Sequence, residues 1–172
     1  TEIYTLSLHD ALPILTLGLD SDGRIYVARE FYRRQVLQDE FVRTVRRRAD
    51  EDGFTTVLCD PSAAGLIGAL QAEGFSCPPV DNAIFDGLQR VQNRLAVAGD
   101  GRARLLVAPS CENTIREFES YCWKQGVAGR DPADLPVKQF DHAMDALRYG
   151  VAYLDGYAEP AIYRLDDLEA MI

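Results

Sequence analysis

Residues 55–65 read Thr-Thr-Val-Leu-Cys-Asp-Pro-Ser-Ala-Ala-Gly, a short apolar run that ends in an acid and a turn. The run at 56–59 predicts a buried strand, and a helix is predicted directly after the turn, at about 63–73. In open α/β sheets, ligands bind at the carboxyl ends of the strands. Asp60 stands at such an end and is therefore a candidate ligand-binding residue. The alternative is that Asp60 caps the following helix, with Pro61 in its first turn.

The rest of the chain continues this mixture of strands and helices. Residues 15–19 and 24–31 alternate apolar and polar side chains around Asp20-Ser-Asp-Gly, which predicts an antiparallel hairpin. A short strand is predicted after Cys77-Pro-Pro-Val, and another at 103–107. Helices are predicted at 36–49, 86–98, 113–123 and 141–154. The sequence therefore predicts one α/β domain.

A second informative stretch, residues 139–150, reads Gln-Phe-Asp-His-Ala-Met-Asp-Ala-Leu-Arg-Tyr-Gly. Because residues three and four apart share a helix face, Asp141, His142 and Asp145 can converge on one point. Oxygen ligands with one imidazole suit magnesium or manganese better than structural zinc, which takes more Cys or His. The alternative is that the acids only favour the helix dipole and that His142 is an ordinary surface residue.

Four segments in this order resemble the C-terminal nuclease domain of the phage terminase large subunit. They are the strand with Asp60-Pro-Ser, then residues 80–95, 104–124 and 136–149, of which the last is the most specific. The resemblance covers residues 15–154. It implies an α/β fold of the RNase H-like type, with a mixed sheet flanked by helices. It also implies an endonuclease that cuts concatemeric double-stranded DNA by two-metal phosphodiester hydrolysis.

Carried over to this chain, the resemblance implies that Asp60 and Asp145 are catalytic and metal-binding, with His142 and Asp141 as further metal ligands. It implies two Mg²⁺ or Mn²⁺ ions as cofactors. The implied partners are double-stranded DNA, the portal protein and the small terminase subunit, in the cytoplasm of the bacterial host. The alternatives are another RNase H-like nuclease, of the resolvase or transposase type, and a non-catalytic truncated module that docks on DNA or on the packaging machinery.

The chain departs from the family at its beginning. Relatives carry an acid on the first strand, in a Gly-Asp-Trp-Gly-like segment, whereas Thr1-Glu-Ile-Tyr-Thr-Leu-Ser-Leu-His-Asp-Ala-Leu-Pro-Ile resembles translated sequencing-adapter DNA. On this interpretation His9 and Asp10 are accidental and the first catalytic acid is missing, so nuclease activity is expected to be weak or absent. The alternative is a divergent first strand at 3–8. The interpretation divides the chain into a non-native leader at 1–14, a nuclease domain at 15–154 and an acidic tail at 155–172.

Composition limits the other classes of function. The 172 residues suit a single domain, and no Gly-rich phosphate loop of an ATPase is present. No apolar run approaches the length of a membrane span, and the four cysteines have no paired spacing, which indicates reduced thiols. The formal net charge of −9 opposes DNA binding. However, arginines gather at 33–48 and 90–104 and could contact DNA, with a solvated amphipathic helix as the alternative for the first group.

Several other polar and aromatic residues have simple expected roles. Asp20 and Asp22 are expected to be turn residues. Acids at the end of a strand or on a helix usually face solvent, which is the expectation for Glu30, Glu117 and Glu119. Aromatic residues at helical spacing usually pack in the core, which is the expectation for Tyr121 and Trp123.

Overall fold

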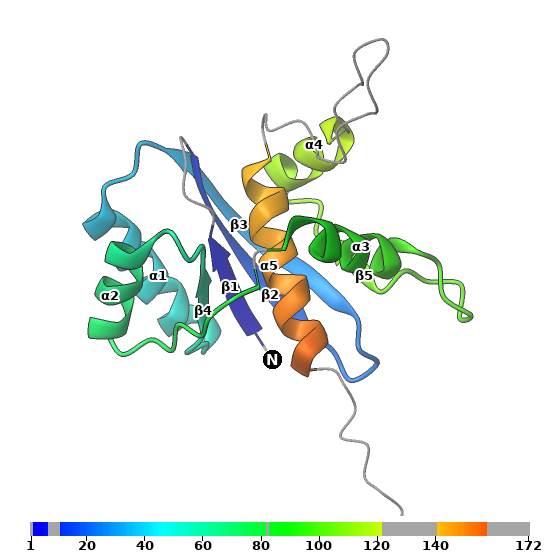
Figure 1. Cartoon of the computed structure of the whole chain (residues 1–172), viewed down its shortest axis with the longest axis horizontal. Helices are drawn as coiled ribbons and strands as arrows, with labels where there is room; N and C mark the ends of the chain where they lie inside the picture. The colour runs from blue at the N-terminus through cyan, green and yellow to red at the C-terminus, as the bar shows by residue number, and fades with distance from the viewer. Residues whose placement is uncertain (1, 7–10, 82, 122–140, 158–172) are drawn as a thin grey trace, which may run out of the picture.

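The structure, a computed structural model, describes residues 2–6, 11–81, 83–121 and 141–157. These residues form a five-stranded mixed sheet in the order β4-β1-β2-β3-β5 (Figure 1). Only β2 runs against the other strands. The strands are β1 (Glu2–Leu6), β2 (Ala11–Leu19), β3 (Ile25–Arg34), β4 (Val57–Cys59) and β5 (Leu105–Val107). The helices are α1 (Gln38–Asp52), α2 (Ala64–Ala72), α3 (Ile84–Leu95), α4 (Glu112–Ser120) and α5 (His142–Tyr157).

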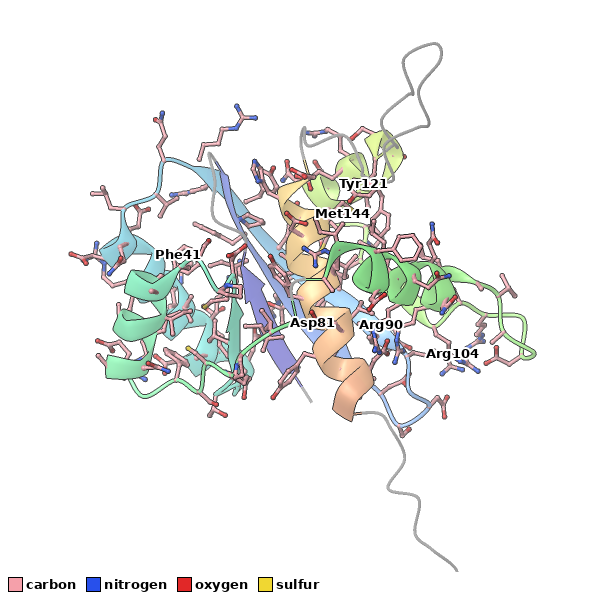
Figure 2. The ribbon with its side chains drawn as sticks, in the orientation of Figure 1. Phe41, Asp81, Arg90, Arg104, Tyr121 and Met144 are labelled. Carbon is pink, nitrogen blue, oxygen red and sulfur yellow. The ribbon has the colours of Figure 1, made fainter. Side chains whose placement is uncertain are left out.

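Helices cover both faces of this sheet, and each face has its own core. Because side chains alternate along a strand, Leu58 of β4 packs with α5, while its neighbours Val57 and Cys59 pack with α1 and α2. Figure 2 shows Phe41 among the side chains of the α1 and α2 layer, and Met144 where α5 meets α4. No helix in the described ranges is long and apolar enough to cross a membrane.

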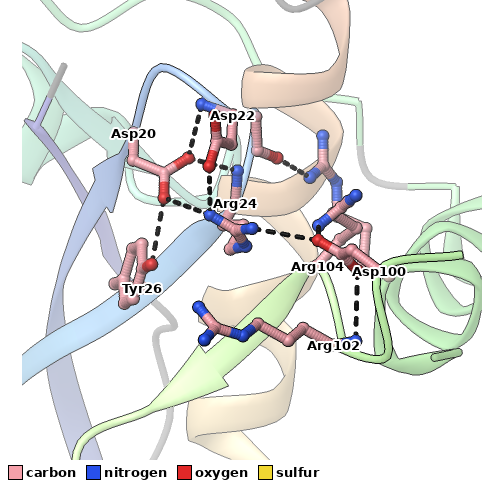
Figure 3. A network of polar contacts seen from close by, with 9 residues as sticks. Asp20, Asp22, Arg24, Tyr26, Asp100, Arg102 and Arg104 are labelled. Atoms are coloured by element: carbon pink, nitrogen blue, oxygen red, sulfur yellow. Dashed lines mark hydrogen bonds and ion pairs between the residues drawn. The ribbon is translucent and has the colours of Figure 1, made fainter. Parts of the chain in front are cut away.

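The hairpin predicted at Asp20-Ser-Asp-Gly is confirmed by the pairing of β2 with β3. Asp20 Oδ1 accepts hydrogen bonds from the backbone N–H groups of Asp22 and Arg24, at 2.9 and 2.8 Å. The Arg24 guanidinium also reaches Asp100 in the turn before β5, at 3.0 Å (Figure 3). Asp20 and Asp22 are therefore turn residues, as expected, and the network joins two turns that are far apart in the sequence.

The sheet includes residues that the sequence analysis assigned to a leader. Glu2–Leu6 pairs antiparallel with β2 and parallel with β4, so β1 lies inside the sheet rather than at its edge. β2 begins at Ala11, and its Ile14 is 1% exposed in the core. A first strand, which was the alternative to a leader, is therefore present, at Glu2–Leu6 rather than at 3–8. The assigned tail boundary also lies inside an element, because α5 continues to Tyr157.

The strand predicted after Cys77-Pro-Pro-Val is wrong. Ser76 forms an isolated parallel bridge with Thr56, but residues 77–81 and 83 belong to no strand, and α3 begins at Ile84. Two consecutive prolines cannot donate hydrogen bonds to a ladder, which explains why pairing stops there. The cysteines that the structure describes, Cys59, Cys77 and Cys111, are free thiols, as expected.

Candidate metal site at the carboxyl edge of the sheet

Asp60 lies at the sheet edge where β1, β3 and β4 all end, because these three strands run in the same direction. Its Oδ1 accepts hydrogen bonds from Ser62 N at 2.8 Å and from Ser62 Oγ at 2.6 Å. Its side chain therefore orders the turn between β4 and α2. The helix-cap alternative is wrong, since α2 begins after Ala63 and no side-chain hydrogen bond caps it.

Tyr149 of α5 joins Asp60 to the last helix. Tyr149 is 3% exposed, and its Oη donates a hydrogen bond to Asp60 Oδ2 at 2.8 Å. Burial, and then this hydrogen bond, raise the pKa of the Tyr149 hydroxyl, so the hydroxyl keeps its proton and remains the donor. The charge of Asp145 raises the same pKa further. Asp60 and Asp145 therefore both lie within electrostatic range of one buried hydroxyl.

Asp145 lies one helical turn before Tyr149, on the same face of α5. Its Oδ1 accepts a hydrogen bond from Arg148 NH2 at 3.1 Å. Arg148 is only 3% exposed, and its guanidinium lies 4.6 Å from the centroid of the Tyr149 ring. Its NH1 also donates to the carbonyl of Ala83 at 3.3 Å. Arg148 thus holds Asp145 from within the core rather than from the surface.

A glycine on α3 makes room for this buried arginine. A Cβ atom at Gly87 would lie 2.2 Å from Cγ and 2.6 Å from Cδ of Arg148. Real Cβ atoms do not approach other heavy atoms so closely, so any larger residue at this position must displace Arg148. The close approach of α3 to α5 and the position of Asp145 therefore both depend on the missing side chain at Gly87.

Glu117 holds the first turn of α5, and the expectation that it faces solvent is wrong. Glu117 is 4% exposed. Its Oε2 accepts hydrogen bonds from the backbone N–H groups of Ala143 and Met144, at 2.7 and 3.2 Å, and its Oε1 accepts one from Tyr32 Oη at 2.6 Å. Burial outweighs these hydrogen bonds and raises the pKa of Glu117. A helix N-terminus has unpaired N–H groups, and Glu117 pairs two of them from another helix.

Glu30 has a similar role at the start of α4, so it is not the solvent-facing strand-end acid that was expected. Its two carboxylate oxygens accept four hydrogen bonds, two from Asn113 and two from Thr114, all between 2.8 and 2.9 Å. Both Glu30 and Glu117 are acids that bind a helix N-terminus distant in sequence. No local sequence signal marks such a contact, which is why the sequence analysis missed both.

The structure brings the predicted site residues together only in part. Asp141 directly precedes α5, is 9% exposed, and accepts the Asp145 N–H on its carbonyl at 2.9 Å. Burial and the charges of Asp145 and Asp141 raise the pKa of Tyr121 to about 12. His142 is the first residue of α5, and its charge lowers the pKa of Glu117, against the larger effect of burial. Within the described ranges, no three His, Cys, Asp or Glu side chains form a group that could hold a metal ion.

Other residues singled out from the sequence have mixed outcomes. Tyr121 packs against the core beneath α5, as expected. His9, Asp10 and Trp123 lie outside the described residues.

The mixed sheet flanked by helices is the RNase H-like fold of terminase nuclease domains. The large terminase of a thermophilic bacteriophage, solved in complex with ATP-gamma-S, matches 88% of this chain with a TM-score of 0.77 and 27% identity. The nuclease domain of the large terminase of bacteriophage SPP1, solved with bound Mn, matches 89% with a TM-score of 0.64 and 21% identity. The P22 large terminase nuclease domain matches 88% with a TM-score of 0.64 and 20% identity.

These matches confirm the resemblance to phage large terminases that the sequence indicates. The chain spans 39% of the thermophilic phage terminase solved with ATP-gamma-S, but it covers 85% of the SPP1 domain and 79% of the P22 domain. The similarity is thus to the nuclease part of these proteins. No protein-family model and no curated protein matches the chain.

Proposed function

We propose that this chain is the nuclease domain of a terminase large subunit, a metal-dependent endonuclease that cuts concatemeric double-stranded DNA during packaging. The observation that carries the proposal is the hydrogen bond from Tyr149 to Asp60, which brings α5 and Asp145 to the end of β4 in a terminase nuclease fold. Structures of this fold were solved with bound Mn and with bound Cobalt, which supports dependence on a divalent metal. We also propose that the domain acts in the cytoplasm of the bacterial host, with the portal protein and the small terminase subunit as partners.

The donor atoms of Asp60 and Asp145 suit a hard divalent cation such as Mg²⁺ or Mn²⁺. Such ions are commonly held by one or two carboxylates together with substrate phosphates and water, which matches two acids at an open sheet edge. We propose these two acids as the primary ligands, with His142 and Asp141 as outer contributors. A pair of divalent ions, when bound, supplies an activated water and stabilises the leaving oxygen of the phosphodiester.

The surrounding residues position these acids. Tyr149 remains a proton donor and fixes the orientation of Asp60, since its hydroxyl pKa is raised. Arg148 fixes Asp145 from the opposite side, and Glu117 fixes the first turn of α5 on which Asp145 lies. None of these three needs to contact DNA for this role. We therefore treat them as positioning residues rather than catalytic ones.

A non-catalytic docking module is the second candidate, and one observation favours it. Among the described residues, no three His, Cys, Asp or Glu side chains form a group that could hold a metal ion, so Asp60 and Asp145 have no third primary ligand there. A site with fewer carboxylates binds a pair of cations less tightly, because fewer negative charges offset their mutual repulsion. We therefore propose that the nuclease activity of the chain is weak.

The nuclease proposal is tested by nicking of supercoiled plasmid in manganese. We expect slow, sequence-tolerant nicking by the wild type, and at least a tenfold loss in Asp60→Asn and in Asp145→Asn. Asp39→Asn is the matched control, because Asp39 is an exposed acid in the first turn of α1. Nicking that persists in Asp145→Asn, or that continues in EDTA, would contradict the proposed site.

A further inference from the structure

We propose that the cleft between the end of β3 and α4 binds the phosphodiester backbone of the DNA strand that enters the candidate metal site. This inference rests on the proposed function and adds a DNA-contacting surface to it. The cleft has a volume of about 500 Å³. Its walls are Tyr32, Arg33 and Arg34 from β3 and Asn113, Arg116 and Ser120 from α4.

The cleft carries positive charge that the residues described by the structure do not neutralise. Arg34 and Arg116 form no ion pair with any residue that the structure describes. Arg33 approaches Glu40 at 3.3 Å, but the two side chains are 63% and 45% exposed, so water screens this pair. The one carboxylate of the lining, Glu117, is buried and already accepts three hydrogen bonds. Arg34 and Arg116 therefore offer two guanidinium groups to an anionic ligand, whereas the guanidinium of Arg33 lies over the Phe31 ring and beside Glu40 of α1.

Most of the other arginine group indicated by the sequence is paired with acids. Arg90 and Arg94 pair with Asp155, and Arg104 pairs with Asp100 (Figure 3). In the second arginine region, at 90–104, only the exposed Arg102 side chain has no ion pair with a residue that the structure describes. In the first region, Arg46 of α1 pairs with Glu73 at 3.5 Å. A shallow hollow there is lined by Val42, Arg43, Arg46, Arg47, Asp50 and Glu73.

The position of the cleft links it to the candidate metal site. β3 ends at the same sheet edge as β4, where Asp60 lies. Glu117 lines the cleft and also binds Ala143 and Met144, the residues directly before Asp145. Figure 1 shows α4 beside the first turn of α5. A strand lying in the cleft would therefore pass the first turn of α5 next to Asp145.

The chemistry of the lining selects a phosphodiester chain. Guanidinium groups bind phosphate oxygens through paired N–H donors, and two of them on opposite walls of one cleft, Arg34 and Arg116, suit neighbouring phosphates of a chain. Asn113 and Ser120 add neutral hydrogen-bonding groups of the kind that contact phosphate and sugar oxygens. Because these contacts involve the backbone of DNA, binding should depend on salt and hardly on base sequence.

The test is fluorescence anisotropy of a labelled 30-base-pair duplex with the whole chain at low salt in EDTA, where no cleavage occurs. The cleft variant is Arg34→Ala with Arg116→Ala. The matched control is Arg43→Ala with Arg47→Ala, which removes the same charge from exposed arginines of α1. We expect at least tenfold weaker binding for the cleft variant and less than a threefold change for the control. The slope of log K against log salt should fall by about 0.9 for each lost phosphate contact.

Equal losses in the two double variants would overturn the inference, as would the absence of duplex binding by the wild type at low salt. All substituted arginines are exposed, so unchanged thermal midpoints will show that the variants are folded. The outcome is separable from the nuclease proposal. DNA binding that depends on the cleft, without any nicking, would support the cleft inference and contradict the nuclease proposal. Nicking that both double variants retain would support the nuclease proposal and contradict the cleft inference.

Discussion

Tyr149 Oη lies 2.8 Å from Asp60 Oδ2, and this hydrogen bond joins two residues 89 positions apart in the sequence. Tyr149 belongs to α5 and Asp60 follows β4, so the bond fixes the last helix against the carboxyl edge of the sheet. The donor is buried and its acceptor is an ionised acid, which makes the bond stronger than one between neutral groups. The geometry of the candidate site therefore depends on a residue outside the set of proposed ligands.

Tyr149→Phe should lower the free energy of unfolding by about 1.5–3 kcal/mol, the usual range for a hydrogen bond to a charged group. Urea denaturation of Tyr149→Phe, of Asp60→Ala and of the double variant measures the coupling free energy between the two side chains. We expect the phenylalanine substitution to cost clearly less when Asp60 is already absent. Strictly additive effects would mean that the hydrogen bond contributes nothing.

Gly87→Ala should destabilise the protein by about 1–3 kcal/mol, because the new methyl group would overlap Arg148. Helix propensity alone would predict a gain of up to about 1 kcal/mol. Gly68→Ala in α2 is the matched control, since a Cβ there meets nothing within 4 Å. Urea denaturation should show a loss for Gly87→Ala and no loss for Gly68→Ala. A stabilised Gly87→Ala variant would contradict the close packing of α3 on Arg148.

Glu117 predicts a specific pH dependence of stability. Its folded-state pKa is raised above the ordinary value of 4.5, so the folded protein binds this proton more tightly than the unfolded chain does. The stability that comes from this proton is present below pH 4.5 and is lost as the pH rises through the raised pKa. The free energy of unfolding of the wild type, minus that of Glu117→Gln, should therefore fall as the pH rises. Urea titrations at several pH values measure this difference, and a constant or rising difference would contradict the assignment.

The expectation of a missing first acid can be tested by adding one. Position 5 of β1 is paired in parallel register with Leu58, which packs beneath α5 and lies two residues before Asp60. Because paired positions of neighbouring strands lie side by side, Thr5→Asp adds an acid to β1 at the level of Leu58. We expect at least tenfold faster plasmid nicking in manganese, with Thr5→Asn as the isosteric control. Equal rates for the two variants would show that a missing acid at this place does not limit activity.

The sequence predicted where helices and strands lie better than it predicted which of them contact one another. The Asp20 turn and the strand that delivers Asp60 are marked by local residue types, and both appear where they were expected. β1 was only an alternative in the sequence analysis because its sequence has no family motif, although backbone pairing with β2 and β4 needs only an extended segment. The boundary at 155 lies inside α5, which continues through Gly156 to Tyr157 although glycine is typical of a helix end.

The candidate site was only partly predictable for a physical reason. Asp60 and Asp145 stand at positions that strand and helix periodicity reveal. Glu117, Gly87 and the Tyr149 hydrogen bond depend on which helix packs against which, and no local pattern in the sequence encodes that choice. Buried acids that bind a distant helix N-terminus look, in sequence, like ordinary surface acids.

The central claim is that a divalent cation binds between Asp60 and Asp145, and isothermal titration calorimetry with Mn²⁺ tests it most directly. The wild type should bind Mn²⁺, and Asp60→Asn and Asp145→Asn should each weaken binding at least tenfold. Asp86→Asn, which changes an exposed acid of α3, should bind like the wild type. Mn²⁺ affinity that is the same in Asp145→Asn as in the wild type would contradict the claim.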